Sequence, residues 1–172
     1  MSVIAWDGKT LAADKRMCFG TMFRTTTKIF RVGDALCAYA GDAAMGEELL
    51  AWFKAGAIPA DFPPSQRGDD WSGLLVVRKD ALLKYEKSPY PIKIESTHYA
   101  IGCGRDFALA AMYLGHDARA AVEVTIALDS ACGNGIDCIS FDSDLQRWPL
   151  ALKTGRVIRD VKPSCIDSAP PP

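Results

Sequence analysis

The sequence predicts one domain, residues 1–172, with a layered α/β arrangement, and three observations carry this prediction. Strand-like and helix-like stretches follow one another as strands, a helix, further strands, a pair of helices and a last strand. The first two strands are apolar at alternate and intervening positions alike, which is typical of a sheet covered on both faces. With 49% hydrophobic and 24% charged residues, a chain of this length can bury a core without metal or disulfide staples.

The first expected element is a β-hairpin. Two apolar stretches, at residues 3–6 and 9–13, flank an Asp-Gly dipeptide, which is favoured in tight two-residue turns. A two-residue loop pairs Ile4 with Leu11 across the hairpin. In this register, Asp14 lies beside the start of the chain.

Capping residues and turn glycines bound the later elements. Asp42 is the expected N-cap of a helix that ends at Gly56. The segment 58–70 is rich in proline and polar residues and is expected to be a loop within the domain, and residues 168–172 are expected to form a frayed tail. The other expected elements are strands at 28–32, 35–40, 73–78, 81–84, 99–102 and 136–141, a helix from a cap at Asp106 to Gly115, and a helix from Asp117 to about Ser130.

Composition and charge exclude several classes of protein. The chain has 20 Lys and Arg residues against 21 Asp and Glu residues, a formal net charge of −1, and its basic residues are scattered. It therefore presents no field that would attract a phosphate backbone or anionic lipid. No run approaches the roughly 18 apolar residues of a membrane span, and the first residues lack the features of a secretion signal. We expect a cytoplasmic protein with no nucleic-acid or membrane partner.

The six cysteines show no CxxC spacing, and most of them lie in apolar runs. This distribution suits reduced thiols in a protein core. Cys132 and Cys138 are expected to pack in the core. We expect no disulfide, no zinc site and no cofactor.

Three unlike chemical groups gather at the start of the expected hairpin. They are the hydroxyl of Ser2, the carboxylate of Asp14 and the ammonium of Lys28, which begins the next strand. Removal of Met1 would make Ser2 the N-terminus, so that one residue would supply both nucleophile and base. An unperturbed α-amine has a pKa of about 7.7 to 8.0, and a nearby lysine cation held by the aspartate would lower it.

Gly41 is the expected hydrogen-bond donor to the oxyanion of an acyl-transfer reaction. It lies at a strand end just before the helix that Asp42 caps, and its backbone N–H has no side chain in the way. Taken singly, these positions also fit ordinary roles: the serine as a terminal residue, the aspartate and lysine as a structural ion pair, and the glycine as a strand terminator.

Four short motifs occur in a fixed order along residues 2–141. They are SVIAWDGKTLAAD at 2–14, TKIF at 27–30, AYAGD at 38–42 and AIGCG at 100–104. In this order and spacing, they resemble the proteasome β-subunit family, particularly its bacterial HslV branch and the small HslV-related bacterial proteasome homologues (BPH).

The resemblance implies an α+β fold, a four-layer αββα sandwich of the N-terminal nucleophile hydrolase type. It implies a threonine-type endopeptidase that acts on peptides or unfolded proteins and assembles as a homo-oligomeric double ring. The implied catalytic residues are Ser2 in place of the usual Thr, Asp14, Lys28, the oxyanion glycine Gly41, Cys103 in place of a Ser that supports the terminal amine, and Asp129 or Ser130 as a second support. The implied substrate-binding residues are Met17, Cys18, Thr26, Phe30, Tyr39, Gly41, Ala43 and Glu47.

The chain departs from the family pattern at three places. Serine at position 2 lacks the methyl that restrains the side-chain rotamer of threonine, so a slower or less selective nucleophile is expected. Cys103 is only a weak donor and acceptor. A proline-rich stretch at 60–70 replaces the start of a second helix, which leaves the docking of an AAA+ unfoldase open. No role is assigned to residues 142–172.

Two other interpretations are left open. Cys103 lies between two glycines and could form a Cys/His nucleophile pair with His98 or His116. A proteasome-like ring subunit could also be catalytically silent and serve as a scaffold. Retention of Met1 would favour the scaffold, because an acylated nitrogen at Ser2 cannot act as a base.

Overall fold

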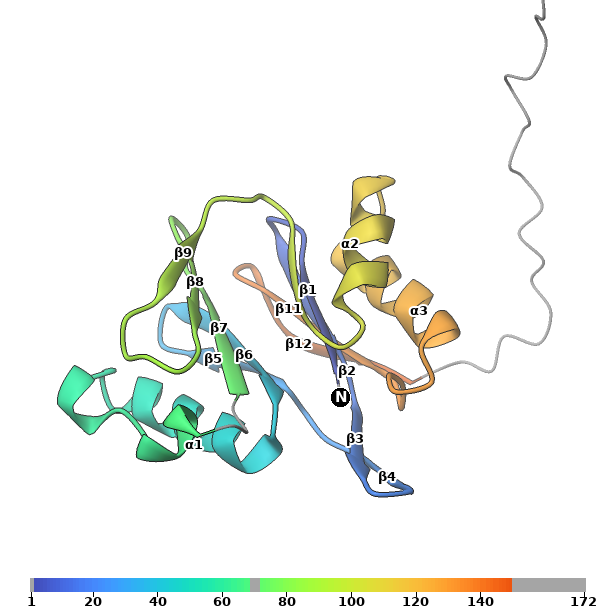
Figure 1. The fold of residues 1–172 in the computed structure, drawn as a ribbon. Helices are drawn as coiled ribbons and strands as arrows, with labels where there is room; N and C mark the ends of the chain where they lie inside the picture. Colours follow the sequence, from blue (N-terminus) through green and yellow to red (C-terminus); the bar gives the residue numbers. More distant parts are fainter. Residues whose placement is uncertain (1, 69–71, 150–172) are drawn as a thin grey trace, which may run out of the picture.

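Two five-stranded antiparallel sheets form the centre of the molecule (Figure 1). The computed structural model describes residues 2–68 and 72–149. The first sheet has the strand order β10 (Tyr99–Gly102), β1 (Val3–Trp6), β2 (Thr10–Asp14), β11 (Ile136–Ser140) and β12 (Ser143–Trp148). The second sheet has the order β5 (Ile29–Val32), β6 (Ala35–Gly41), β7 (Ser72–Val77), β8 (Leu82–Tyr85) and β9 (Ile92–Ile94).

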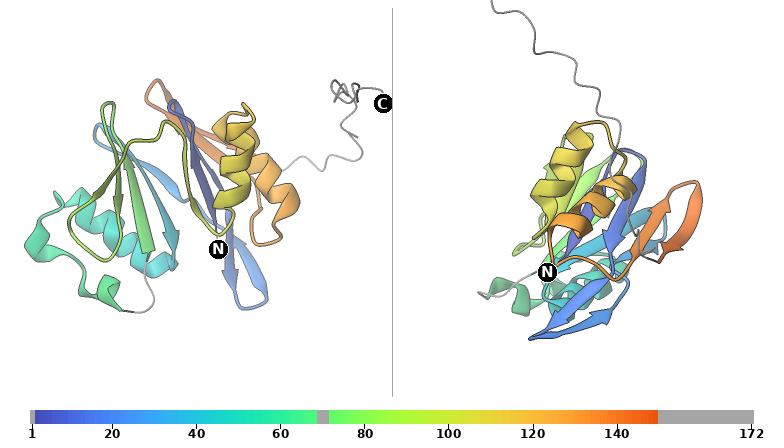
Figure 2. Two further views of the ribbon diagram at one scale, coloured as in Figure 1. Left: turned by 45° about the horizontal axis from the view of Figure 1, so that its top comes forward. Right: turned by 90° about the vertical axis from the view of Figure 1, so that its right-hand side faces the viewer.

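Three helices and a separate hairpin complete the described residues. The hairpin of β3 (Arg16–Phe19) and β4 (Met22–Thr25) projects from the body of the molecule (Figures 1 and 2). The helices are α1 (Ala43–Lys54), α2 (Arg105–Tyr113) and α3 (Ala118–Leu128). Within the described part of the chain, every helix is too short or too polar to cross a membrane.

Three apolar cores hold these elements together. One core joins the first sheet to α2 and α3, through residues such as Val3 and Val122. A second core lies between the two sheets and contains Ile4 and Leu75. The third packs Trp52 of α1 against the second sheet. Figure 2 shows α1 on the opposite side of the paired sheets from α2 and α3.

Strand β1 explains why the sheets pack in this order. All four of its residues are buried. Val3 and Ala5 face the core under α2 and α3, whereas Ile4 and Trp6 face the second sheet. Successive side chains of a strand point to opposite faces. The burial of all four residues of β1 therefore confirms the prediction that this sheet is covered on both faces. Each large apolar side chain buried in this way contributes roughly 1.5–3 kcal/mol.

The predicted register of the first hairpin is wrong by two residues. Ile4 pairs with Ala13 rather than with Leu11. The connection is a longer turn, in which Oδ1 of Asp7 accepts hydrogen bonds from the N–H groups of Lys9 at 2.9 Å and of Thr10 at 2.7 Å. An aspartate side chain that closes a turn in this way competes with the two-residue loop. The shift of two keeps every side chain on its predicted face.

The predicted helix caps are confirmed at two of three positions. Asp42 accepts hydrogen bonds from two N–H groups of the first turn of α1, and Asp117 accepts one from the first turn of α3. The helix α2 instead begins after Gly104, so that Asp106 lies inside its first turn.

Other predicted segments were incomplete. Strands β3, β4, β9 and β12 were not predicted, and the expected loop at 58–70 contains two short 3-10 turns, Pro59–Asp61 and Pro64–Arg67. The expected frayed tail at 168–172 lies outside the described residues.

Candidate active site

The candidate site lies where several strands end at one edge of the two sheets. Ser2 comes directly before β1, Asp14 is the last residue of β2, and Lys28 comes directly before β5. Gly41 is the last residue of β6. The first three of these are polar or charged residues that are 5%, 0% and 3% exposed. The fold thus brings together the three groups that the sequence placed near one another.

Asp14 and Lys28 form a buried ion pair in which both carboxylate oxygens and the ammonium have further hydrogen-bond partners. The Nζ of Lys28 lies 2.6 Å from Oδ1 of Asp14 and donates a second hydrogen bond, of 2.7 Å, to the carbonyl of Arg16. Oδ1 of Asp14 also accepts from the N–H of Val3 at 3.0 Å. Oδ2 accepts from the N–H groups of Arg16 at 3.1 Å and of Gly133 at 3.0 Å. Hydrogen bonds to both of its oxygens fix the orientation of the Asp14 carboxylate. The carboxylate in turn fixes the position of the lysine cation.

Hydrogen bonds with the two residues that follow β10 hold Ser2 in place. Its N–H donates a hydrogen bond of 3.2 Å to Sγ of Cys103, and its carbonyl accepts one of 3.2 Å from the N–H of Gly104. Gly102 has a φ of +97°, and a Cβ atom there would lie 2.1 Å from the carbonyl oxygen of Ser2. Only glycine permits this close approach of the two strands. Sequence reasoning did not single out Gly102, although it lies in the AIGCG motif.

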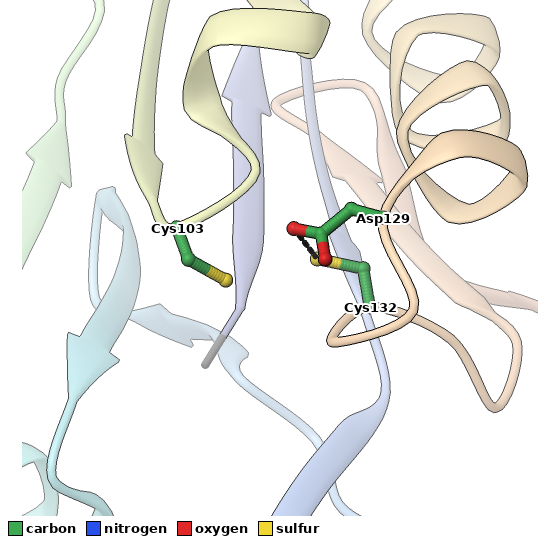
Figure 3. A group of neighbouring side chains, drawn as sticks. All are labelled: Cys103, Asp129 and Cys132. Atoms are coloured by element: carbon green, nitrogen blue, oxygen red, sulfur yellow. Dashed lines mark hydrogen bonds between the residues drawn. The ribbon is translucent and has the colours of Figure 1, made fainter.

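Cys103 is one of three clustered groups next to the Ser2 nitrogen. It follows β10, Asp129 ends α3, and Cys132 lies in the loop before β11. Figure 3 shows their side chains directed toward a common space. Their ligand-forming atoms all lie within 4.8 Å of one another. Cys132 is 1% exposed, as a core residue would be, but sequence reasoning missed that its sulfur faces Cys103.

The two thiols differ in acidity because they interact. A hydrogen bond from Cys132 lowers the pKa of Cys103 to about 6, against the opposing effect of partial burial and with help from the Ser2 N–H. The same hydrogen bond, together with burial, raises the pKa of Cys132 above its usual range. Of the two thiols, Cys103 is therefore the more acidic.

Two cavities meet at Ser2. The larger, of about 650 Å³, is lined by Ser2, Gly41, Gly73, Lys84, Cys103 and Arg105 among others. The smaller, of about 160 Å³, is lined by Ser2, Lys28 and Gly41 and by five of the predicted substrate-binding residues, Met17, Cys18, Thr26, Tyr39 and Ala43. Ser2 and Gly41 line both cavities. Gly41 has a φ of +127°, a conformation that favours glycine.

Besides Asp14 and Asp129, whose contacts are given above, three predicted site residues line neither cavity. Phe30 stacks on Tyr39, with ring centroids 5.7 Å apart, and Oε1 of Glu47 accepts a hydrogen bond of 2.7 Å from the Tyr39 hydroxyl. Both residues therefore support the ring of Tyr39 rather than line the smaller cavity. Burial and Glu47 raise the pKa of Tyr39 above its usual range, so that its hydroxyl stays protonated. Ser130 contributes only its carbonyl, which accepts a hydrogen bond from Arg16.

The structure does not pair Cys103 with a histidine. Neither His98 nor His116 lines the cavity that contains Cys103. Nδ1 of His98 instead forms a hydrogen bond of 3.1 Å with the neighbouring Thr97, at the surface. The backbone N–H of His116 closes the end of α2 on the carbonyl of Ala111.

Solved structures of BPH and HslV proteins share this fold of helices packed on two antiparallel sheets. BPH from Thiobacillus denitrificans in complex with epoxomicin is 19% identical, covers 86% of this chain and 99% of its own, and gives a TM-score of 0.63. A further structure of BPH from the same organism is 20% identical, covers 88% of this chain and 100% of its own, and gives a TM-score of 0.61. Eukaryotic HslV from Trypanosoma brucei is 19% identical, with 80% and 97% coverage and a TM-score of 0.60.

These matches confirm the predicted resemblance at the level of the fold. No protein-family model and no curated protein matches the sequence.

Proposed function

We propose that this chain is a proteasome-like peptidase of the N-terminal nucleophile hydrolase type, a four-layer αββα sandwich in which Ser2 becomes the N-terminal residue after removal of Met1. The observation that carries the proposal is the position of Ser2. It lies at the junction of two cavities, beside a fully buried lysine and aspartate pair and a glycine at a strand end. The shared fold with HslV and BPH supports it.

In the proposed reaction, Oγ of Ser2 attacks the carbonyl carbon of a peptide bond. The Ser2 amine accepts the hydroxyl proton and returns it to the leaving amine, which departs as the acyl-enzyme forms. Water then attacks the ester and releases the acid, with the same amine as base. The N–H of Gly41 stabilises the oxyanion in both steps; one such donor typically contributes about 3–4 kcal/mol.

The neighbours of Ser2 have separate tasks in this proposal. The Lys28 cation favours the neutral amine by like-charge repulsion, and Asp14 holds that cation in place. Cys103 accepts a hydrogen bond from the Ser2 nitrogen at 3.2 Å and so orients it. Asp129 acts behind Cys103, at the second support position. Tyr39, held by Phe30 and Glu47, forms a wall of the smaller cavity, which would receive a substrate side chain.

Exposed apolar side chains support assembly into a homo-oligomeric double ring. Tyr113 and Leu114 at the end of α2 are 92% and 78% exposed, and the β3–β4 hairpin exposes Phe19 and Met22, each at 55%. Grouped apolar side chains of this kind are typical of surfaces buried by a partner. A second copy of the chain is the partner that this proposal requires, and peptide or unfolded protein is the substrate. An AAA+ unfoldase is not part of the proposal.

Intact mass and covalent labelling test the proposal together. We expect the purified chain to lack Met1 and an electrophile that bonds both amine and hydroxyl to modify Ser2; epoxomicin, which a BPH structure contains, is the first to try. Ser2→Ala should reduce peptide hydrolysis by about 1000-fold or more, whereas Ser2→Thr should retain it.

Each contrary outcome has a distinct meaning. Hydrolysis by a chain that keeps Met1 would overturn the mechanism. Turnover that survives Ser2→Ala and is lost in Cys103→Ser would assign the reaction to the thiol. Retained Met1 without turnover would favour a silent scaffold subunit.

A further inference from the structure

Cys103, Asp129 and Cys132 form a compact set of metal-binding side chains at the edge of the larger cavity (Figure 3). Two of the ligand atoms are sulfurs and one is a carboxylate oxygen, all within 4.8 Å of one another. In a tetrahedral zinc site with Zn–S bonds of about 2.3 Å, two sulfurs lie about 3.8 Å apart. The two sulfurs would therefore have to approach each other by about 1 Å at most.

The surrounding backbone preorganises two of the three ligands. Oδ1 of Asp129 accepts a hydrogen bond of 2.8 Å from the N–H of Ala131, while its Oδ2 lies 3.7 Å from Sγ of Cys132. The N–H of Cys132 donates to the carbonyl of Asp129 at 3.1 Å. One tight turn thus presents an oxygen and a sulfur on the same side, and the second carboxylate oxygen is held by the kind of contact that orients metal ligands.

The third ligand approaches from another element, and glycine makes this approach close. A Cβ atom at Gly104 would lie 3.1 Å from Sγ of Cys132 and 2.4 Å from Cγ2 of Thr125. The absence of a side chain lets the Cys103 backbone sit against the turn. Cys103 is exposed and lines the cavity of about 650 Å³, so that an ion can reach the site from solvent.

The donor set selects the class of cation. Thiolates favour zinc and similar thiophilic ions, whereas magnesium and calcium prefer oxygen ligands throughout. With three protein ligands, a tetrahedral ion keeps one open position. The nitrogen of Ser2 lies 3.2 Å from Sγ of Cys103, within reach of an ion bound to that sulfur.

We propose that Cys103, Asp129 and Cys132 bind a thiophilic divalent cation of the zinc class, and that the bound ion engages the freed amine of Ser2 and blocks it as a base. Binding displaces any proton that the two sulfurs carry and involves no redox step. The site itself stands on the side-chain cluster; the inhibitory effect rests on the proposed function. This inference departs from the expectation of no metal site.

Cadmium is a direct probe of the site, because cadmium–thiolate bonds absorb in the ultraviolet. The reduced, metal-stripped chain should take up one equivalent of Cd²⁺, and Zn²⁺ should compete for it. Cys103→Ser, Cys132→Ser and Asp129→Asn should each weaken binding by tenfold or more. Cys138→Ala is the matched control, since that thiol is buried in the sheet away from the cluster, and it should bind like the wild type.

Several outcomes would overturn the site. They are absence of thiolate absorption in the wild-type chain, unchanged binding in both Cys103→Ser and Asp129→Asn, or loss of binding only when Cys165, the cysteine outside the described residues, is changed to serine. Circular dichroism checks each fold. If Cys132→Ser fails to fold, the exposed Cys103 and the Asp129 variant still decide the question.

Peptide hydrolysis then separates the two proposals. Zn²⁺ should inhibit the wild-type enzyme reversibly, with recovery on addition of a chelator, and should inhibit Asp129→Asn at least tenfold less effectively. Metal binding by a chain with no hydrolytic activity would overturn the proposed function and leave the site. Activity without metal binding would overturn the site and leave the function.

Discussion

The Nζ of Lys28 lies 2.6 Å from Oδ1 of Asp14, and both side chains are almost completely buried. A buried ion pair of this kind adds little net stability, but removal of one partner leaves an uncompensated charge and typically costs about 3–5 kcal/mol. The pair is therefore more informative about the site than about the fold.

Lys28→Met should impair both stability and catalysis. We expect a loss of about 3–5 kcal/mol in the free energy of unfolding and at least about a 100-fold loss in kcat/KM. In the proposed mechanism the Lys28 cation favours the neutral Ser2 amine, so that its loss should move the acidic limb of the pH profile to higher pH. Arg78→Ala, which breaks an exposed ion pair with Asp34, is the control. An unchanged kcat in folded Lys28→Met would contradict the assigned role.

Gly102→Ala should displace Ser2 and abolish peptide hydrolysis. Its new Cβ would lie 2.1 Å from the Ser2 carbonyl oxygen, at a φ of +97°. Gly115→Ala is a matched control, because its φ is +92° and no atom lies within 4 Å of the added Cβ. Each variant should lose about 1–3 kcal/mol from backbone strain. Thermal unfolding measures the loss of stability from backbone strain, and kinetics measure the additional effect of the clash with Ser2. Equal activity of the two variants would contradict a role of Gly102 in positioning Ser2.

Ala43→Leu should narrow the smaller cavity and change substrate selectivity. Ala43 lines the cavity of about 160 Å³, whereas Ala44, one residue further along, does not and is exposed. We expect kcat/KM for substrates with large side chains to fall by about 10-fold or more relative to substrates with alanine or glycine. Ala44→Leu should leave that ratio unchanged. The ratio is measured with a series of short peptides, and a parallel fall for all of them would exclude a role in selectivity.

Cys103 should react with iodoacetamide at a lower pH than the other described thiols. A hydrogen bond from Cys132 lowers its pKa to about 6, so that the reactive thiolate predominates above that pH. Burial raises the pKa of Cys37 and Cys138 to about 12, and these two should stay unlabelled. Peptide mapping in the presence of a chelator measures the rates. In Cys132→Ala, the half-maximal rate should move to higher pH; no such shift would contradict the hydrogen bond.

Local signals in the sequence predicted much of the fold. Asp42 and Asp117 were identified as caps because a cap depends on neighbouring backbone N–H groups. The apolar run of β1 indicated burial on both faces for a similar reason. The hairpin register could not be predicted from neighbouring residues alone. Asp7 accepts hydrogen bonds from N–H groups of its own turn and also from the N–H of Ala118, 111 residues away.

The candidate site was predicted where its residues lie in short motifs. Ser2 and Asp14 are brought together by neighbouring strands of one sheet, which the sequence indicated, and Lys28 reaches them from the start of β5 in the second sheet. Cys132 was missed because its contact with Cys103 depends on how the turn after α3 folds back toward β10, which no spacing in the chain encodes. Phe30 and Glu47 were assigned to the cavity itself, although they contact Tyr39 from behind.

The second carboxylate oxygen of Asp7 lies 2.8 Å from the N–H of Ala118, the first residue of α3. Asp129 caps the opposite end of the same helix, about 16 Å away at 1.5 Å per residue. Asp7 thus holds the start of α3, and Asp129 and Cys132 lie at and just after the other end of this helix. Loss of the hydrogen bond between Asp7 and Ala118 would therefore let α3 shift and would change the position of Cys132 relative to Cys103.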